Sequence, residues 1–208
     1  MGKVYQFIER SPFPSLVGTK MLSPKMDDLR GVQFLHPDQV DAASAISASP
    51  ATRGYPVDRA GMPSAVLWES KNKPVPDVHM SRGVNIVSER VRDVIETREP
   101  DVHQFLPVEL LRPKADKPFA NHYWMIVCRR IDSLHPILTT YTRDANGAWN
   151  VLGGGHFVFD LSVIGSGQMW RDPSIGVGYT LCSEALALAL SAMNPTGLEL
   201  LPFDAAPR

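Results

Sequence analysis

The sequence predicts an α+β fold: a mixed or mainly antiparallel sheet with packed helices, containing two similar helix-strand units. The first observation is a pattern that occurs twice without a gap, 95 residues apart, at Ser88 and again at Ser183. In each copy Ser-Glu opens a helix-like stretch, and Leu-Pro follows inside a strand-like stretch at Pro107 and Pro202. The second observation is composition, because 44% hydrophobic and 21% charged residues among 208 are ordinary for a protein with a packed core.

Charge and cysteine usage narrow the class of protein. Lys and Arg number 21 against 22 Asp and Glu, so charge gives no reason to expect a nucleic acid or an anionic membrane as partner. Cys128 and Cys182 form no Cys-x-x-Cys pair and are expected to be free thiols. The first ten residues lack the apolar run of a signal peptide, and no apolar run is long enough to span a bilayer. These features predict a cytoplasmic protein.

Short elements are expected before the first unit. Asp38 is placed to cap a short helix at residues 39–47. Residues 49–63 contain three prolines and two glycines and are expected to form a loop. Strands are expected at residues 4–8 and 65–68, and a polar connection at 70–76.

The first helix-strand unit begins with a cap. Ser88 is a good N-cap, because its hydroxyl can accept a hydrogen bond from the free amides of the first turn. Glu89 suits the positive end of the helix dipole. Val91, Val94 and Ile95 have the i, i+3, i+4 spacing of one buried stripe. The pattern predicts a helix with one buried face.

Four strands are expected between this helix and the second one. Residues 103–111 read as a strand, and Pro107 within it indicates an edge or a bulge. Residues 123–131 open with a continuous apolar run, which is typical of a central strand covered on both faces. Residues 137–141 and 157–164 are the other two expected strands.

The second unit closes the chain. Asn146-Gly147 before it is a strong hairpin signal if strands flank it. Ser183 is expected to cap a helix at residues 184–193 that is apolar nearly all round. This helix should therefore be buried more deeply than the first. Residues 198–203 form the expected final strand.

No motif makes a strong case for catalysis or for a metal. Residues 153–156 (Gly-Gly-Gly-His) lack the Gly-x-Ser-x-Gly elbow that an oxyanion loop would need. No two of the six histidines are three or four residues apart, so no metal-binding pair is expected. Cys182 precedes a helix N-terminus, where a thiol pKa can fall, but its apolar neighbours favour a buried structural role. The sequence therefore predicts no catalytic residues, no metal and no cofactor.

Two tryptophans and an arginine are the candidate partner-binding residues. Trp149 and Trp170 lie in loop-like sequence near glycines, and Arg171 follows directly after Trp170. Exposed aromatic residues beside arginine suit an interface hot spot, although core packing is the commoner role of tryptophan. We take Trp149, Trp170 and Arg171 as the predicted contact residues.

Several segments together resemble a known family. Residues 86–93 (Ile-Val-Ser-Glu-Arg-Val-Arg-Asp) and 104–108 (Gln-Phe-Leu-Pro-Val) resemble the central signature of a bacterial immunity-protein family of polymorphic toxin systems, formerly a domain of unknown function. Residues 169–172 (Met-Trp-Arg-Asp), 182–186 (Cys-Ser-Glu-Ala-Leu) and 197–200 (Gly-Leu-Glu-Leu) resemble its C-terminal part. Trp170 stands where the pattern has phenylalanine. The resemblance covers roughly the last two-thirds of the chain.

The resemblance implies a non-catalytic protein that binds and neutralises a cognate toxin by occlusion, with no cofactor. Residues 1–208 are then one domain, or two subdomains of about 1–115 and 116–208. The alternatives are a small cytoplasmic hydrolase using Cys182 or a histidine, and an assembly module of a secretion locus. The toxin, the binding face, the oligomeric state and the role of residues 39–63 are left open.

Overall fold

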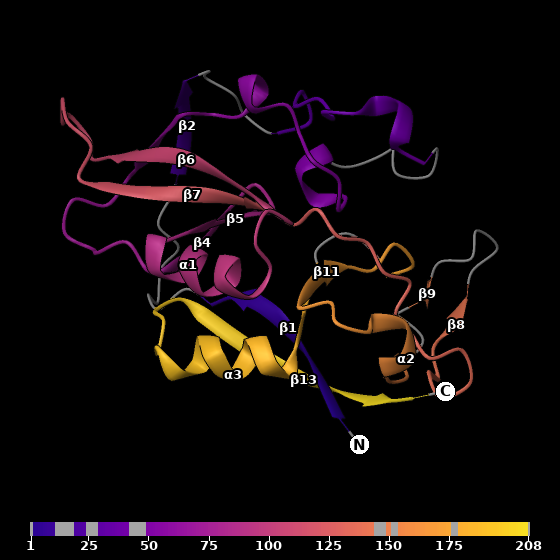
Figure 1. The fold of residues 1–208 in the computed structure, drawn as a ribbon. Coiled ribbons are helices and arrows are strands. Elements are labelled where there is room, and N and C mark those ends of the chain that lie inside the picture. The colour runs from indigo at the N-terminus through magenta and orange to yellow at the C-terminus, as the bar shows by residue number, and fades with distance from the viewer. Residues whose placement is uncertain are drawn as a thin grey trace.

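The computed structural model describes residues 2–10, 19–23, 29–41, 49–143, 149–150, 154–175 and 179–207 (Figure 1). Its strands are β1 (Gly2–Glu9), β2 (Thr19–Ser23), β3 (Ala65–Trp68), β4 (Val78–Ser81), β5 (Val84–Val87), β6 (Gln104–Leu111), β7 (Ala120–Ile126), β8 (Thr142–Arg143), β9 (Trp149–Asn150), β10 (Val158–Asp160), β11 (Met169–Arg171), β12 (Thr180–Ser183) and β13 (Leu198–Ala206). Its α-helices are α1 (Glu89–Arg98), α2 (Leu161–Ile164) and α3 (Glu184–Ala192). Its 3-10 helices are η1 (Pro37–Gln39), η2 (Pro50–Thr52) and η3 (Arg59–Gly61).

The strands form two mixed sheets and one short pair. A six-stranded sheet has the order β2-β3-β6-β7-β5-β4, and a five-stranded sheet has the order β10-β13-β1-β12-β11. Each contains one parallel pair, β3 with β6 or β10 with β13, and its other pairs are antiparallel. β8 pairs with β9 separately, so two strands do flank the predicted 146–147 turn, which itself lies outside the described residues. The predicted α+β class with a mixed sheet is confirmed.

α1 follows the predicted stripe. Val91 and Ile95 are 0% exposed, and Val94 is partly buried. Ser88 occupies the N-cap position in extended conformation, as predicted, but its hydroxyl does not accept from the first turn. It donates instead to Asp77 Oδ1 at 2.9 Å. The position of the cap could therefore be predicted from sequence, whereas its hydrogen-bond partner lies just before β4.

α3 has both a buried and an exposed apolar face. The Ser183 hydroxyl accepts from Leu186 N at 3.1 Å, so here the predicted cap bond is present. Leu186 and Leu190 are 0% exposed, but Leu188 is 63% exposed. The expectation of a helix buried nearly all round therefore holds for one face only.

The two helices lie close together and link the sheets (Figure 1). One buried cluster contains Val91 of α1, Leu186 of α3, Phe7 of β1 and Met125 of β7. Because β1 belongs to the five-stranded sheet and β7 to the six-stranded sheet, this cluster joins both. Two further clusters fill the remaining interior of the described chain, one on the other side of β7 and one around Trp170.

β7 is the central strand that the apolar run predicted. Trp124 and Ile126 pack in one cluster, while Met125 packs in another, so both faces of the strand are covered. The strand ends at Ile126 rather than at residue 131. Beyond it, Ile131 N donates to Arg171 O, so the following residues run beside β11.

Pro107 and Pro202 each lie where their strand is paired on one side only. Pro107 pairs with β7, while the parallel pairing of β6 with β3 begins only at Glu109. Pro202 pairs with β1, while the parallel pairing of β13 with β10 begins only at Asp204. A proline cannot donate a backbone hydrogen bond, so it is tolerated at such a local edge. The edge predicted from Pro107 is confirmed.

Two predicted strands were wrong in whole or in part. Residues 137–141 form a turn, because His135 Nδ1 accepts from the amides of Ile137 and Leu138, both at 3.2 Å. Residues 157–164 divide into β10 and α2, because the Asp160 carboxylate caps the helix by accepting from Ser162 N at 2.9 Å. In both cases a polar side chain bonds to the nearby backbone and ends the extended conformation. Of the helix expected at residues 39–47, only 39–41 are described, and Gln39 closes η1.

The sheets do not divide the chain near residue 115. β1 lies among C-terminal strands in the five-stranded sheet, and β7 lies in the six-stranded sheet although it follows residue 115. The division into one domain or two subdomains stays a prediction. Within the described residues, no helix is both long and apolar enough to cross a membrane.

Candidate partner-binding surface

The three predicted contact residues lie in the interior or at its margin. Trp170 is 0% exposed, and its indole Nε1 donates to Ser133 Oγ at 2.9 Å. Trp149 is 8% exposed, and the guanidinium of exposed Arg143 stacks over its ring at 4.5 Å. Arg171 is 6% exposed. Trp149 and Trp170 belong to one core cluster. Because both side chains are buried, a partner would contact the residues that cover them.

Arg171 faces away from that cluster. Successive side chains of a strand point to opposite faces, so the side chains of Trp170 and Arg171 lie on opposite faces of β11. Arg171 is bridged in parallel to Arg130, which puts these two side chains on one side. The sequence therefore predicted three residues together, and the structure brings only the two tryptophans into one cluster.

Arg53, Arg130 and Arg171 converge around Gly54; we call these three residues the arginine cluster. Gly54 has φ +83°, and a Cβ there would lie 2.6 Å from Arg130 Cγ and 3.2 Å from Arg171 Cβ. Arg130 also donates to Arg53 O at 2.8 Å. A glycine is needed at this position both for its backbone conformation and for the close approach of the two arginines.

Burial disfavours the charged forms of two arginines in the arginine cluster. Burial lowers the pKa of Arg171 to about 10. Burial also lowers the pKa of Arg53; the positive charge of Arg130 adds to that shift, and the negative charge of Asp41 opposes it. Desolvation destabilises the charged form of a buried cation.

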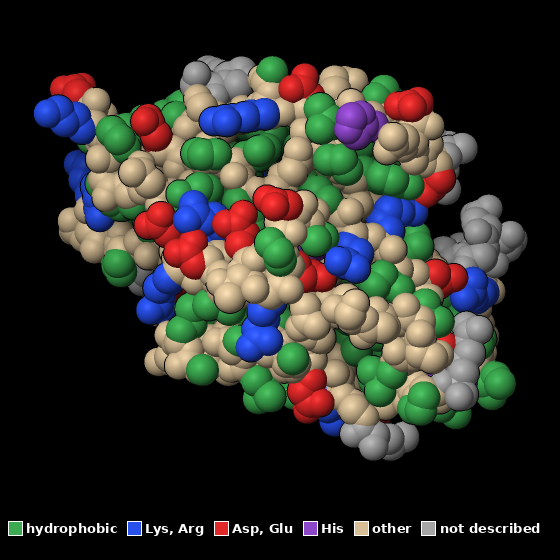
Figure 2. Space-filling model, viewed as in Figure 1, with side chains coloured by type: hydrophobic (Ala, Val, Ile, Leu, Met, Phe, Trp, Pro, Cys, Tyr) green, Lys and Arg blue, Asp and Glu red, His purple; other side chains and the backbone are tan. Residues whose placement is uncertain are grey.

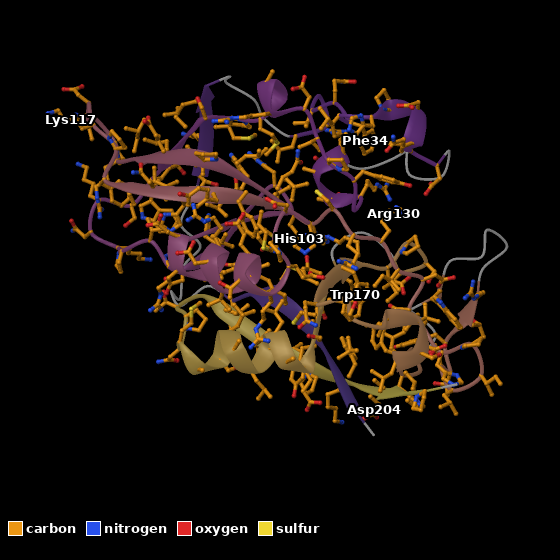
Figure 3. The ribbon with its side chains drawn as sticks, in the orientation of Figure 1. Phe34, His103, Lys117, Arg130, Trp170 and Asp204 are labelled. Atoms are coloured by element: carbon orange, nitrogen blue, oxygen red, sulfur yellow. The ribbon has the colours of Figure 1, made fainter. Side chains whose placement is uncertain are left out.

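Aromatic and acidic side chains flank the exposed side of the arginine cluster. The Arg130 guanidinium lies 4.6 Å from the centre of the Tyr55 ring, and Tyr55 makes an edge contact with Phe34 at 5.8 Å. Asp41 Oδ2 accepts from Arg130 at 2.5 Å and from the Tyr55 hydroxyl at 3.0 Å. Figure 3 shows Arg130 between the segment that carries Phe34 and the strand that carries Trp170. Aromatic rings with arginine are the composition of interface hot spots.

Sequence reasoning missed this surface. Phe34, Asp41 and Tyr55 come from segments without a regular pattern, and Arg130 follows a strand by only a few residues. In the sequence, only the arginine side chains of Arg130 and Arg171 could have pointed to a binding surface. Their pairing could not be predicted, because they are far apart in sequence and no local pattern indicates that they are bridged. Figure 2 shows acidic and basic side chains intermixed over this face, so a charged stripe could not reveal the surface either.

Glu99 forms a buried brace at the end of α1. Its carboxylate accepts from His103 Nε2, Arg129 and the amides of Gln168 and Met169, all at 2.9 Å. Burial opposes its charge, but these hydrogen bonds, led by the one from His103, lower the pKa of Glu99. His103 Nδ1 accepts from Cys128 N, so its Nε2 carries the proton given to Glu99. These hydrogen bonds join α1 to β11, and both ring nitrogens of His103 take part in them.

Asp77 forms a second brace, at the other end of α1. It accepts from Ser88 Oγ, from Arg90 through two nitrogens, and from the backbone and hydroxyl of Thr196. Burial opposes the charge of Asp77, but these bonds hold its pKa well below the usual range. The Ser-Glu motif of the first unit is thus tied to the loop before β13.

Cys182 does not provide the nucleophile that the hydrolase alternative needs. Its thiol is 0% exposed in the cluster between the helices, and burial raises its pKa to about 12. Activation requires a depressed thiol pKa and a neighbouring base. Among the described residues, no group of three or more His, Cys, Asp and Glu side chains could hold a metal ion.

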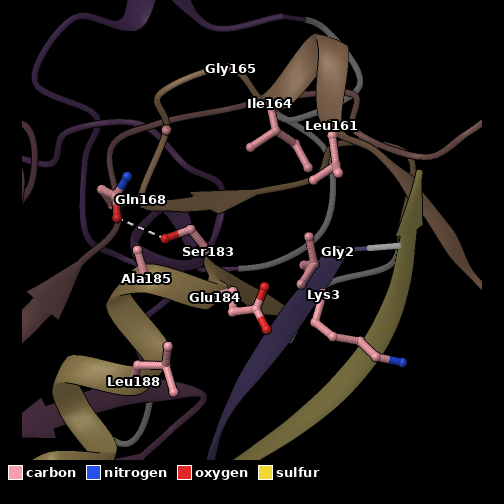
Figure 4. A pocket seen from close by; sticks show the side chains of 12 residues that line it. Gly2, Lys3, Leu161, Ile164, Gly165, Gln168, Ser183, Glu184, Ala185 and Leu188 are labelled. Atoms are coloured by element: carbon pink, nitrogen blue, oxygen red, sulfur yellow. Dashed lines mark hydrogen bonds between the residues drawn. The ribbon is translucent and has the colours of Figure 1, made fainter. Parts of the chain in front are cut away.

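A shallow groove of about 500 Å³ lies between α2 and the start of α3 (Figure 4). Leu161 and Leu188 lie on opposite sides of it, and the hydrogen bond from Ser183 Oγ to Gln168 crosses its wall at 2.7 Å. The groove is mainly apolar and contains the carboxylate of Glu184. It is a second candidate surface feature, separate from Phe34, Tyr55 and Arg130.

Comparison with known families agrees with the segments noted in the sequence. No curated protein matches the chain significantly. The model of the immunity protein family (Imm11) matches residues 20–204, which include both helix-strand units and the arginine cluster. The chain therefore belongs to the immunity protein family Imm11.

Proposed function

We propose that this protein binds a cognate bacterial toxin in the cytoplasm and neutralises it by occlusion, without catalysing a reaction. The observation that carries this proposal is the family match over residues 20–204. An inhibitor of this kind needs a surface with a few strongly contributing side chains. We assign this role to Phe34, Tyr55 and Arg130, because two aromatic rings and a guanidinium contact one another there.

The contact face that we propose extends from this surface toward the predicted residues. Arg143, stacked on Trp149, is exposed and can reach a partner, whereas Trp149 holds it in place from below. Trp170 would act through packing, because its indole fixes Ser133 beneath the surface. Arg171 would contribute charge beneath Arg130.

We also propose that the two helix-strand units are similar in structure as well as in sequence. Each pairs the strands on either side of its helix with one antiparallel strand between them, β7 for β5 and β6, and β1 for β12 and β13. Pro107 and Pro202 both lie two positions before their parallel pairing begins. The units would then act as scaffold, leaving the irregular segments for recognition.

Coexpression with the toxin encoded next to this protein tests the proposed function. We expect growth to be restored and a stable complex to elute in size-exclusion chromatography, with an interface of roughly 1,200–2,000 Å². An unrelated immunity protein expressed at the same level is the control. Persistent toxicity despite abundant soluble protein would contradict the proposal, and so would rescue without a complex.

A further inference from the structure

Three consecutive apolar residues, Pro136, Ile137 and Leu138, are exposed at a turn; we call these three residues the apolar tip. Ile137 is 83% exposed, more than any other large hydrophobic residue in the part of the chain that the structure describes. Leu138 beside it is 40% exposed. Single exposed apolar side chains are ordinary on a protein surface, whereas a run of three exposed apolar residues is typical of a binding site.

The turn that carries the apolar tip is held by hydrogen bonds of its own. His135 Nδ1 accepts from the amides of Ile137 and Leu138, both at 3.2 Å, and the amide of Thr139 donates to His135 O at 3.1 Å. Pro136 has no amide hydrogen, and its ring fixes its φ. Each backbone amide of residues 137–139 therefore has a partner inside the turn, so the backbone of the apolar tip is fixed before any partner binds.

The base of this turn is bonded to β10, a buried strand. His135 N donates to Val158 O at 2.8 Å, and Thr139 Oγ1 donates to the same oxygen at 3.0 Å. The amide of Val158 donates to Thr139 Oγ1 at 3.2 Å. All three residues are buried. The apolar tip therefore stands on a rigid base, and such preorganisation reduces the entropy that is lost on binding.

The turn is close in the chain to Arg143, which belongs to the contact face proposed above. Leu134 before the turn and Tyr141 after it both pack in the core cluster that contains Trp149. The Arg143 guanidinium stacks over the Trp149 ring. The apolar tip and Arg143 thus belong to neighbouring segments that cover one core cluster, so one partner can contact both.

We propose that the apolar tip anchors the toxin: Ile137 and Leu138 insert into an apolar cleft of the toxin, and His135 is the positioning residue that holds them. This inference rests on the proposed function, which supplies the partner. A convex tip fits a concave surface, and ligand and substrate sites are usually concave and mainly apolar. The two aliphatic side chains stabilise the complex because their apolar area is removed from water.

Ile137→Gln tests the apolar tip, and Leu188→Gln is the matched control, because Leu188 is also an exposed aliphatic residue, at 63%, but lies on α3. Both variants should keep the wild-type Tm within about 2 °C, because each changes a solvent-exposed side chain. In surface plasmon resonance with the cognate toxin, Ile137→Gln should bind at least about tenfold more weakly, mainly through faster dissociation. Leu188→Gln should bind as the wild type does. Wild-type affinity of Ile137→Gln, or equal losses in both variants, would overturn the proposal.

The role of His135 is tested by removing its acceptor atom and then restoring it. His135→Leu should weaken toxin binding at least about fivefold, because the tip loses its fixed conformation. His135→Asn provides an amide oxygen that can accept from the same two amides, as in an Asx turn, and should return the affinity to within about twofold of wild type. A purely structural role would lower the Tm of His135→Leu and leave the affinity of its folded molecules unchanged. That result, or no recovery in His135→Asn, would contradict the positioning role; should His135→Leu not fold, Ile137→Gln still decides the proposal.

The same measurements separate this inference from the proposed function. If the wild-type protein does not bind the toxin, the proposed function fails and the inference fails with it. If the wild type binds and Ile137→Gln binds equally well, the inference alone fails. Analytical ultracentrifugation without toxin tests another occupant: a wild-type dimer that Ile137→Gln converts to a monomer would show that the apolar tip contacts a second copy of the chain, and would overturn the toxin contact.

Discussion

At the scale of single residues, buried polar side chains in this protein differ in how well they are compensated. Glu99 and Asp77 accept several hydrogen bonds each, and their lowered pKa values reflect this. His79 is the opposite case, because its Nε2 is buried without a hydrogen-bond partner and its ring packs edge-on against Trp68. Compensated groups stabilise the fold, whereas His79 and Arg171 reduce its stability when charged.

His79 should make stability depend on pH. Burial lowers its pKa to about 4, and the nearby charge of His122 adds to the shift. Because the unfolded chain takes up this proton near its ordinary pKa of about 6.5, the unfolding free energy should fall as pH decreases from about 6.5 to about 4, by about 3 kcal/mol.

Urea denaturation at intervals between pH 4 and 7 measures this effect. His79→Gln cannot titrate and should flatten the slope in that window. Exposed His36→Gln is the control and should leave it unchanged. An identical slope in wild type and His79→Gln would show that other groups cause the pH dependence.

At the scale of elements, sequence predicted those features that depend on local spacing. The caps at Ser88 and Ser183, the stripe of α1 and the covered strand β7 follow from nearest neighbours along the chain. The turn at residues 137–141 was not predictable, because it depends on the orientation of the His135 ring. Strand order was equally hidden, because it depends on pairings between distant residues.

The two faces of α3 should respond differently to substitution. Leu190→Ala removes buried contacts between the sheets and should lower the unfolding free energy by about 2–5 kcal/mol. Leu188→Ala, on the exposed face, should change it by less than about 0.5 kcal/mol. Guanidinium denaturation of both variants compares the faces directly. A large loss for Leu188→Ala would mean that this face is covered, for example by a second copy of the chain.

At the scale of the whole molecule, the contact residues were the least predictable part. Trp149, Trp170 and Arg171 were chosen because aromatic and arginine side chains lie near glycines, but such sequence is equally suited to a core. The arginine cluster joins residues 53, 130 and 171, and only contacts between distant parts of the chain bring them together around Gly54. Their role in toxin binding stays a prediction.

A substitution at Gly197 tests how much the contact between the loop before β13 and the six-stranded sheet contributes to stability. It has φ +80°, and a Cβ there would overlap Val78 O of the six-stranded sheet. Gly197→Ala should therefore lower the unfolding free energy by more than about 2 kcal/mol, through backbone strain and displacement of this contact. Gly165→Ala has a positive φ but no atom within 4 Å of the added Cβ, so its loss should be about 1 kcal/mol. Similar losses in thermal unfolding would show that the Val78 contact contributes little.

The position of β1 between β12 and β13 has a consequence for synthesis on the ribosome. The six-stranded sheet uses residues 19–126, so its strands can pair while the rest of the chain is still being made. β1 is translated before both of its partners, which come from residues 180–206. Its backbone groups must therefore wait until those residues are made, and a ribosome that stops before them releases a protein in which β1 lacks both of its partner strands.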